Sequence, residues 1–282
     1  MDEEIIYSKR GYLNEDFRFF HLKDCKGLEF EYHYHEFDKI VVFLSGKTSY
    51  VIEGVTYNLR PGDMLLISNH LIHKAIVQEA EPYERIIIYV SRRFAEENST
   101  ENTPLMKCFD NALKEREHLI RPEKTDSMRI EQELRRIEDA VNSDSFGSDV
   151  LAKTYFLQFL ISVNKCADKN AGKESSTPYK YDSQIAEVLN YINDNLSDEL
   201  SVDALAAKSY LSKYYFMRRF KEMTGYTVHS YILLKRVLYA SELLHTGTPA
   251  TKAAILSGFG DYSTFSRAYK KIYGETPKRT RK

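Results

Sequence analysis

Cysteine is scarce in this chain, and long apolar runs are missing. The 282 residues include only Cys25, Cys108 and Cys166, an odd number without the short spacing of metal ligands. This predicts reduced thiols in a cytoplasmic protein rather than a disulfide-stabilised secreted fold. No run approaches the ~20 apolar residues that span a bilayer, and the start MDEEIIYSKR is acidic where a signal peptide would be basic. We therefore expect no membrane partner.

Catalytic signatures are missing as well. The chain has no GxSxG, no P-loop, no dinucleotide fingerprint and no HExxH. We therefore expect no enzyme activity and no cofactor. The composition, with 43% hydrophobic and 29% charged residues, is that of an ordinary globular protein, and the length suggests two domains.

Charge is divided unevenly along the chain. From Tyr179 to the end there are 16 Lys and Arg against 10 Asp and Glu, which gives +6 and leaves −7 for the residues before it. Contacts with DNA phosphates require such a basic part. The C-terminal part is therefore the candidate for nucleic-acid binding, although a solvated charged surface is the simpler alternative.

The basic part contains one helical unit twice. LSKYYFMRRFKEMTGYT aligns with GDYSTFSRAYKKIYGET at a constant offset of 49 residues, with capping residues Ser212 and Asp261 at the two starts. Each copy follows a short Ala-rich helix, which is the helix-turn-helix plan whose second helix enters the major groove. A helix predicted from Val228 to Gly247 would span about 27 Å, close to the roughly 34 Å between successive major grooves. This helix is suited to hold two DNA-reading helices in adjacent grooves.

These residues, in their order and spacing, resemble the signature of the AraC/XylS family of bacterial transcription regulators. The matching pattern is LSxYYFxRxFKxxTGxT, YIxxxRxxxAxxLL and GFxDxSxFSRxYKKxxGxTP. The resemblance implies a sequence-specific regulator that binds double-stranded promoter DNA and works with RNA polymerase, as an activator like most relatives. It implies six base-reading residues: Tyr214, Met217, Arg218, Tyr262, Ser263 and Arg267.

Among these six, Arg218 and Arg267 stand out because the Arg fork fits the O6 and N7 acceptors of guanine. Met217 offers only an apolar contact, such as one to a thymine methyl group. Phosphate contacts are expected from Lys213, Lys221, Lys270, Lys271 and Arg281, each of which has a solvated surface residue as its alternative. Arg236 is expected either at a phosphate or beside an acidic residue of its own domain.

The first 95 or so residues are predicted to form a small β-barrel or sandwich. The predicted strands are FEYHYHEF, KIVVFLSG, TSYVIEG, VTYNLRPGD, MLLIS and ERIIIYVS, separated by Gly, Pro and Asp turn signals. Together, HYHEFDKIVVFLSG, the PGD turn and His73 resemble the cupin sensor domain that precedes many AraC-type DNA-binding domains. The same stretch supplies the candidate effector site.

His33 and His35, two apart on an expected strand, point to one face, and His73 is expected from another strand. Three imidazoles suit a metal, but the metal-binding cupin pattern has a Glu four residues after its second His, where this chain has Lys39. A cation there repels a metal, so we expect none. A small polar ligand held by His33, His35, Lys39 and His73 is the leading hypothesis, with structural histidines as the alternative. Lys39 favours a carboxylate, phosphate or sugar hydroxyl, and the resemblance implies a carbohydrate.

Between Pro104 and Asn170 the apolar period is helical, with a break at 142–147. The apolar face around Leu151 either packs on the barrel or pairs with a second subunit, and the resemblance implies a homodimer. We thus predict an α+β multidomain fold: a cupin-like β-barrel (1–103), a helical dimerisation segment (104–168), a flexible linker (169–178) and an all-α double helix-turn-helix domain (179–282). The rival functions are a regulator whose barrel only dimerises and, more remotely, a metal-dependent cupin enzyme.

Overall fold

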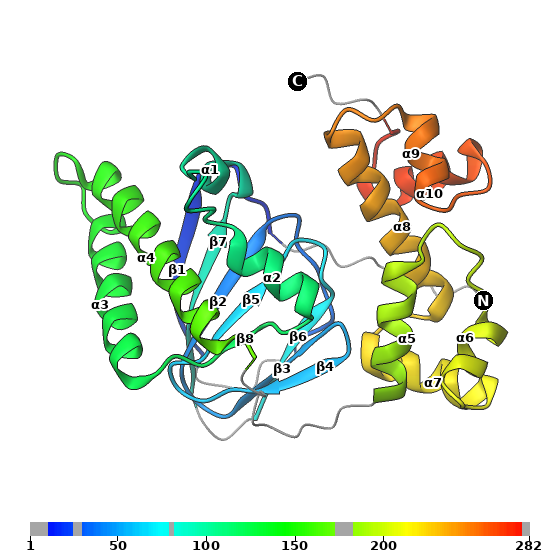
Figure 1. The fold of residues 1–282 in the computed structure, drawn as a ribbon, viewed down its shortest axis with the longest axis horizontal. Coiled ribbons are helices and arrows are strands. Elements are labelled where there is room, and N and C mark those ends of the chain that lie inside the picture. The colour runs from blue at the N-terminus through cyan, green and yellow to red at the C-terminus, as the bar shows by residue number, and fades with distance from the viewer. Residues whose placement is uncertain (1–10, 25–29, 79–81, 173–182, 278–282) are drawn as a thin grey trace.

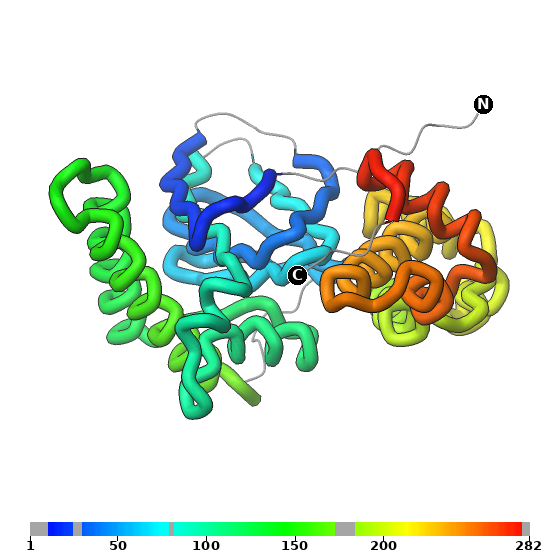
Figure 2. Tube along the Cα trace, turned by 90° about the horizontal axis from the view of Figure 1, so that it is seen from above, coloured from blue at the N-terminus to red at the C-terminus, as the bar shows by residue number. Residues whose placement is uncertain are grey.

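The computed structural model describes residues 11–24, 30–78, 82–172 and 183–277, and it places them in two lobes (Figure 1). All the strands lie in the N-terminal lobe, and the C-terminal lobe is helical. In both views the hairpin of α3 (Lys124–Val141) and α4 (Ser148–Asn170) lies on the side of the strands away from the C-terminal lobe (Figures 1 and 2). The strands therefore stand between this hairpin and the C-terminal helices.

Two antiparallel sheets form the N-terminal lobe, with strand orders β1-β7-β2-β5-β8 and β4-β3-β6. The strands are β1 (Phe17–Asp24), β2 (Asp38–Ser45), β3 (Thr48–Ile52), β4 (Val55–Asn58), β5 (Met64–Ile67), β6 (His73–Val77), β7 (Tyr83–Val90) and β8 (Leu119–Ile120). In β2, Val41 and Phe43 pack against the smaller sheet, whereas Ile40 and Val42 join the core that includes α4. Because both faces of β2 are buried, its sequence is a continuous apolar run.

The expectation of a regular strand over FEYHYHEF is wrong. Of these residues, His33 forms an isolated bridge with His73, and the two exchange backbone hydrogen bonds of 3.1 and 3.0 Å. The ladder does not continue because His35, the next position along, accepts from the N–H of His70, a residue with φ +64, and the N–H of Leu71 donates to Ser68 instead. Sequence reasoning also missed β1, β8 and the short helix α1 (Arg92–Glu97).

The helical segment has the expected break. α2 (Lys107–Glu115) comes first, and Gly147, with φ +83, precedes α4. Phe156 and Phe159 of α4 are fully buried against the larger sheet. The expected linker begins later than 169, because Lys169 is helical and pairs with Asp126 at 2.7 Å; residues 173–182 lie outside the described part. Among the described helices, none combines the length and apolarity needed to cross a bilayer.

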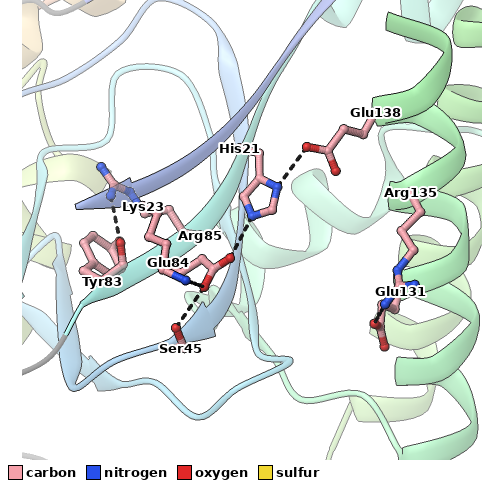
Figure 3. A network of polar contacts seen from close by, with 9 residues as sticks. All are labelled: His21, Lys23, Ser45, Tyr83, Glu84, Arg85, Glu131, Arg135 and Glu138. Carbon is pink, nitrogen blue, oxygen red and sulfur yellow. Dashed lines mark hydrogen bonds and ion pairs between the residues drawn. The ribbon is translucent and has the colours of Figure 1, made fainter. Parts of the chain in front are cut away.

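A polar network fixes α3 to the sheet (Figure 3). His21 of β1 shares its ring nitrogens between Glu138 of α3, at 2.9 Å, and Glu84 of β7, at 3.1 Å. Burial opposes a charge on His21, but the two carboxylates outweigh it and raise the pKa of the imidazole. When it is protonated, the ring donates to both carboxylates and so links α3 to the sheet.

The C-terminal lobe contains the predicted duplication. Its helices are α5 (Ser183–Asp194), α6 (Val202–Lys208), α7 (Lys213–Thr224), α8 (Val228–His245), α9 (Ala250–Leu256) and α10 (Tyr262–Tyr273). Ser212 accepts a hydrogen bond from the Tyr215 N–H before α7, and Asp261 accepts one from Thr264 before α10. Each helix then ends at a glycine with φ +77. Two helix pairs, α6–α7 and α9–α10, are thus joined by α8.

Candidate nucleic-acid interface and effector site

The second helix of each pair buries one face and exposes the other. Phe216 and Phe220 of α7 are fully buried, as is Phe265 of α10. The opposite faces carry the six residues predicted to read bases, all of them exposed: Tyr214, Met217, Arg218, Tyr262, Ser263 and Arg267. The buried aromatics fix which face of each helix points outward. The helical spacing of the six residues then places three of them on the exposed face of α7 and three on that of α10.

The two central arginines differ in their partners. Arg218 Nε donates to Glu222 Oε1 at 3.0 Å, and Arg219 Nη1 donates to the other oxygen of Glu222 at 3.1 Å. Arg267 Nε instead donates to the backbone carbonyl of Ser263 at 3.3 Å. At the offset of 49 residues, the counterpart of Glu222 is Lys271. In α7 a carboxylate therefore holds the central arginine, whereas α10 has the cation Lys271 at the matching position.

The candidate phosphate contacts divide into two groups. Lys221, Lys270 and Lys271 are exposed near the C-terminal ends of α7 and α10. Lys213 is paired with Asp203 at 2.9 Å, and Arg281 lies outside the described residues. Basic side chains so placed beside DNA-reading helices fix register without reading sequence.

Arg236 has a structural role inside the C-terminal lobe. Its Nε donates to the carbonyl of Leu196 at 2.9 Å and its Nη2 to that of Asp198 at 2.7 Å. A Cβ at Gly258 would meet this guanidinium at 2.9 Å and the Leu196 oxygen at 2.1 Å. The expected acidic partner is thus replaced by backbone carbonyls.

The structure brings together the three histidines and the lysine predicted to bind a ligand. One ring nitrogen from each of His33, His35 and His73 lies within 4.8 Å of the others, and all three residues are buried. His33 and His73 each donate from Nδ1 to a backbone carbonyl at 2.8 Å. Lys39 Nζ donates to His73 Nε2 at 2.8 Å and to His35 Nε2 at 3.1 Å. We call these four residues the histidine–lysine cluster.

The histidine–lysine cluster does not fit a divalent metal. Neutral imidazoles with Nδ1 bonded to carbonyls are oriented as metal ligands are, but the Lys39 ammonium lies among their nitrogens. Burial, followed by the positive charge of Lys39, holds the pKa of His73 well below its usual value. The cluster therefore places the Lys39 ammonium beside a His73 ring that resists protonation, which suits hydrogen bonding to a carboxylate, phosphate or hydroxyl.

Sequence reasoning missed the residues that join the two lobes. Glu53, in the turn between β3 and β4, has φ +45, and its carboxylate accepts hydrogen bonds from Lys235 Nζ at 2.7 Å and from the Tyr231 hydroxyl. Burial opposes ionisation of Glu53, but Lys235 outweighs it and lowers the pKa of the carboxyl. The sequence held one sign that Glu53 has a further role. A two-residue hairpin turn ending in Gly54 favours Asn at position 53, because both of its residues take positive φ, and this chain has Glu there instead. A groove of about 930 Å³ opens beside this pair and is lined by both lobes.

The family comparisons cover both lobes. The profile described as "AraC-like ligand binding domain" matches residues 20–160, and that described as "Helix-turn-helix domain" matches residues 205–282. The chain is 27% identical over 252 residues to the probable transcriptional regulator LumQ of Photobacterium leiognathi, which covers 88% of this chain and 90% of LumQ. It is 24% identical over 250 residues to the transcriptional activator RhaR of Pectobacterium atrosepticum, a match that covers 88% of this chain and 84% of RhaR.

One further relative matches only a part of this chain. The regulatory protein PocR of Salmonella typhimurium is 31% identical over 122 residues, and the chain spans 40% of its length. Among solved structures, ToxT from Vibrio cholerae is 16% identical, with a TM-score of 0.36, and the match covers 93% of this chain and 97% of ToxT. The DNA-binding domain of AdpA in complex with a target DNA is 30% identical over 33% of this chain and 84% of that one, with a TM-score of 0.32. With its ligand-binding profile over half of the sequence and its helix-turn-helix profile over the end, the chain belongs to the AraC family of DNA-binding transcription regulators.

Proposed function

We propose that this protein is a sequence-specific regulator, an activator, whose α7 and α10 read two blocks of promoter DNA. The observation that carries the proposal is the pair of capped helices, each with an exposed Arg at its centre and a buried aromatic face. At 1.5 Å per residue, the 18 residues of α8 extend about 27 Å, so the two helices suit neighbouring major grooves. RNA polymerase is the partner that activation requires.

Selection of genomic fragments tests this function. Purified protein is incubated with sheared DNA from its source organism, and the retained fragments are sequenced. We expect a few promoter-proximal sites with two blocks about one helical turn apart, and their loss in Arg218→Ala, Arg267→Ala. The matched control is Arg93→Ala, Arg135→Ala, which removes two exposed helical arginines from the N-terminal lobe, each paired to a glutamate as Arg218 is. An equal loss of these sites in both double variants would contradict the assignment of Arg218 and Arg267 as residues that read bases.

We further propose that the histidine–lysine cluster binds a small polar effector, a carbohydrate or related metabolite with a hydroxyl, carboxylate or phosphate. The buried ammonium of Lys39 supports this because a cation shielded from water favours groups that carry negative charge or accept hydrogen bonds. A thermal-shift panel of sugars, sugar phosphates and organic acids tests it, with Lys39→Met as the variant that loses the response. No stabilisation by any compound would favour the alternative, a barrel that serves only dimerisation.

A homodimer is also proposed, through the α3–α4 hairpin. Phe146, in the turn between the two helices, and Val150 and Leu151, in the first turn of α4, are all exposed. Large exposed apolar side chains that gather in one place mark interaction sites. Sedimentation of the wild type and of Phe146→Ser, Leu151→Ser decides the point: a monomer in both would remove this surface from the proposal.

A further inference from the structure

The two segments that carry the histidines also carry the contacts to the C-terminal lobe. His33 and His35 alternate with Tyr32 and Tyr34, and His73 follows Ile72 directly. His33 and His73 are paired through backbone hydrogen bonds, so the segments lie side by side. We call residues 32–35 and 70–73 the connecting segments. His33, His35 and His73 belong to the cluster, whereas their neighbours Tyr34 and Ile72 belong to a core of the C-terminal lobe, so each segment contributes side chains to both.

The outward faces are embedded in the first helix-turn-helix unit. Tyr34 is 0% and Ile72 2% exposed, and both belong to the core built around Phe216 and Phe220 of α7. Tyr32 packs at the edge of this core. A Cβ placed on Gly225, the residue that ends α7, would lie 2.5 Å from Cδ2 of Tyr32. The connecting segments therefore contact the C-terminal end of α7 and contribute to the core that its buried aromatic side chains also join.

A polar path leads from the same segments to α8. The backbone N–H of Ile72 donates to Glu53 Oε1 at 2.8 Å, and Lys235 Nζ donates to the same oxygen at 2.7 Å. The N–H of His70 donates to the carbonyl of His35 at 2.7 Å, and the carbonyl of His70 accepts from Lys235 at 3.2 Å. The backbone of His35 is thus two hydrogen bonds from α8, and so is that of Ile72, the neighbour of His73.

We propose that the histidine–lysine cluster controls how firmly the C-terminal end of α7 and the Lys235 turn of α8 are held, through the connecting segments. The proposal rests on the proposed effector site and names the route by which that site regulates DNA binding. A group that displaces Lys39 Nζ from His35 and His73 moves rings whose backbones also carry Tyr34 and Ile72. Closely packed cores transmit such shifts because they have few voids to absorb them.

Hydrogen–deuterium exchange of the full chain tests the route without DNA or effector. Lys39→Met keeps the length of the side chain and removes the ammonium. We expect exchange in residues 224–235 to become at least about fivefold faster, the lower end of coupling between sites, while residues 250–256 of α9 are unchanged. The control is Ile88→Val, an equally buried change on the helix-facing side of the large sheet. Faster exchange confined to residues 30–40 and 70–77, or equal changes in both variants, would overturn the proposal.

The reverse experiment uses the reciprocity of coupling. Lys235→Met changes a side chain of α8, and we expect the loss of its hydrogen bonds to Glu53 and His70 to shift the imidazole NMR signals of His33, His35 and His73, whereas Lys213→Met on α7 does not. Unmoved signals in Lys235→Met would also contradict the route. A failure of the proposed function is distinguishable, because it leaves these results intact and instead removes specific promoter recovery or effector stabilisation.

Discussion

Glu53 and Lys235 form a buried ion pair between the two lobes, with 2.7 Å between Nζ and Oε1 and about a tenth of each side chain exposed. Taking both charges out of water is costly, and the attraction repays that cost only where further hydrogen bonds complete the site. Here the carboxylate also accepts from Tyr231 and from the Ile72 N–H, and the ammonium also donates to the His70 carbonyl. The pair is therefore held in one geometry, and so are the lobes that carry it.

Removal of one partner of this ion pair should lower the free energy of unfolding much more than removal of both. Lys235→Met leaves the Glu53 carboxylate buried without its cation, which costs about 3–5 kcal/mol. Adding Glu53→Asn should recover most of this loss, because the second change removes the stranded charge and gives the turn the Asn-Gly pair that its positive φ angles favour. Urea unfolding measures both variants. Lys213→Met, which breaks the exposed pair with Asp203, should cost less than about 1 kcal/mol.

The His21 network predicts a stability that falls at higher pH. The pKa of His21 is raised above its ordinary 6.5, so its contribution is complete below 6.5 and is lost as pH rises through the folded value. The effect should stay under about 1 kcal/mol, because a third of the side chain is exposed. Thermal unfolding of the wild type between pH 5 and pH 9, against His21→Gln, isolates it. A pH profile that is identical in the two proteins would exclude His21 as the cause.

Much of the fold follows from local sequence patterns. Both helix-turn-helix units could be predicted from the duplicated sequence. Their signals, which are caps such as Ser212, terminal glycines such as Gly225 and buried aromatics such as Phe216, act on residues within one or two helical turns of themselves. β2 is equally plain, since burial on both faces leaves a continuous apolar run. The spacing of His33 and His35 and the position of Lys39 were enough to predict that these groups converge.

The rest depends on contacts between distant parts of the chain. Tyr34 looks like a strand residue of the barrel, yet it belongs with Ile72 to a core whose remaining buried members begin at Ile185. Glu53 reads as turn punctuation until its partner, 182 positions later, is known. Edge strand β1 was missed because its residues are only partly buried and give a weak pattern. Local propensity carries no information about such pairings.

Lys39→Glu should convert the histidine–lysine cluster into a metal site. The variant replaces the ammonium with a carboxylate among three imidazoles, a ligand set that suits Zn²⁺. We expect one equivalent of Zn²⁺ to bind and to stabilise the variant by about 2.7 kcal/mol at a hundredfold excess over Kd. Isothermal titration and thermal shift measure this. The wild type should show neither effect, and zinc bound by the wild type with equal affinity would mean that Lys39 does not exclude it.

The carboxylate of Glu222 should restrain DNA binding by the first unit. Arg218 must leave Glu222 to reach a base, and Arg219 shares the same carboxylate. Exposed helical pairs contribute about 0.3–0.5 kcal/mol each, so Glu222→Gln should tighten binding to the selected promoter fragments about two- to fivefold. Glu222→Lys, which copies the cation found at Lys271 in the second unit, should tighten it further and steepen the salt dependence. Fluorescence anisotropy against salt concentration measures both, with Glu97→Gln as the control because Glu97 pairs with Arg93 in the other lobe. Unchanged or weaker binding by Glu222→Gln would show that Arg218 reads no base in the first block.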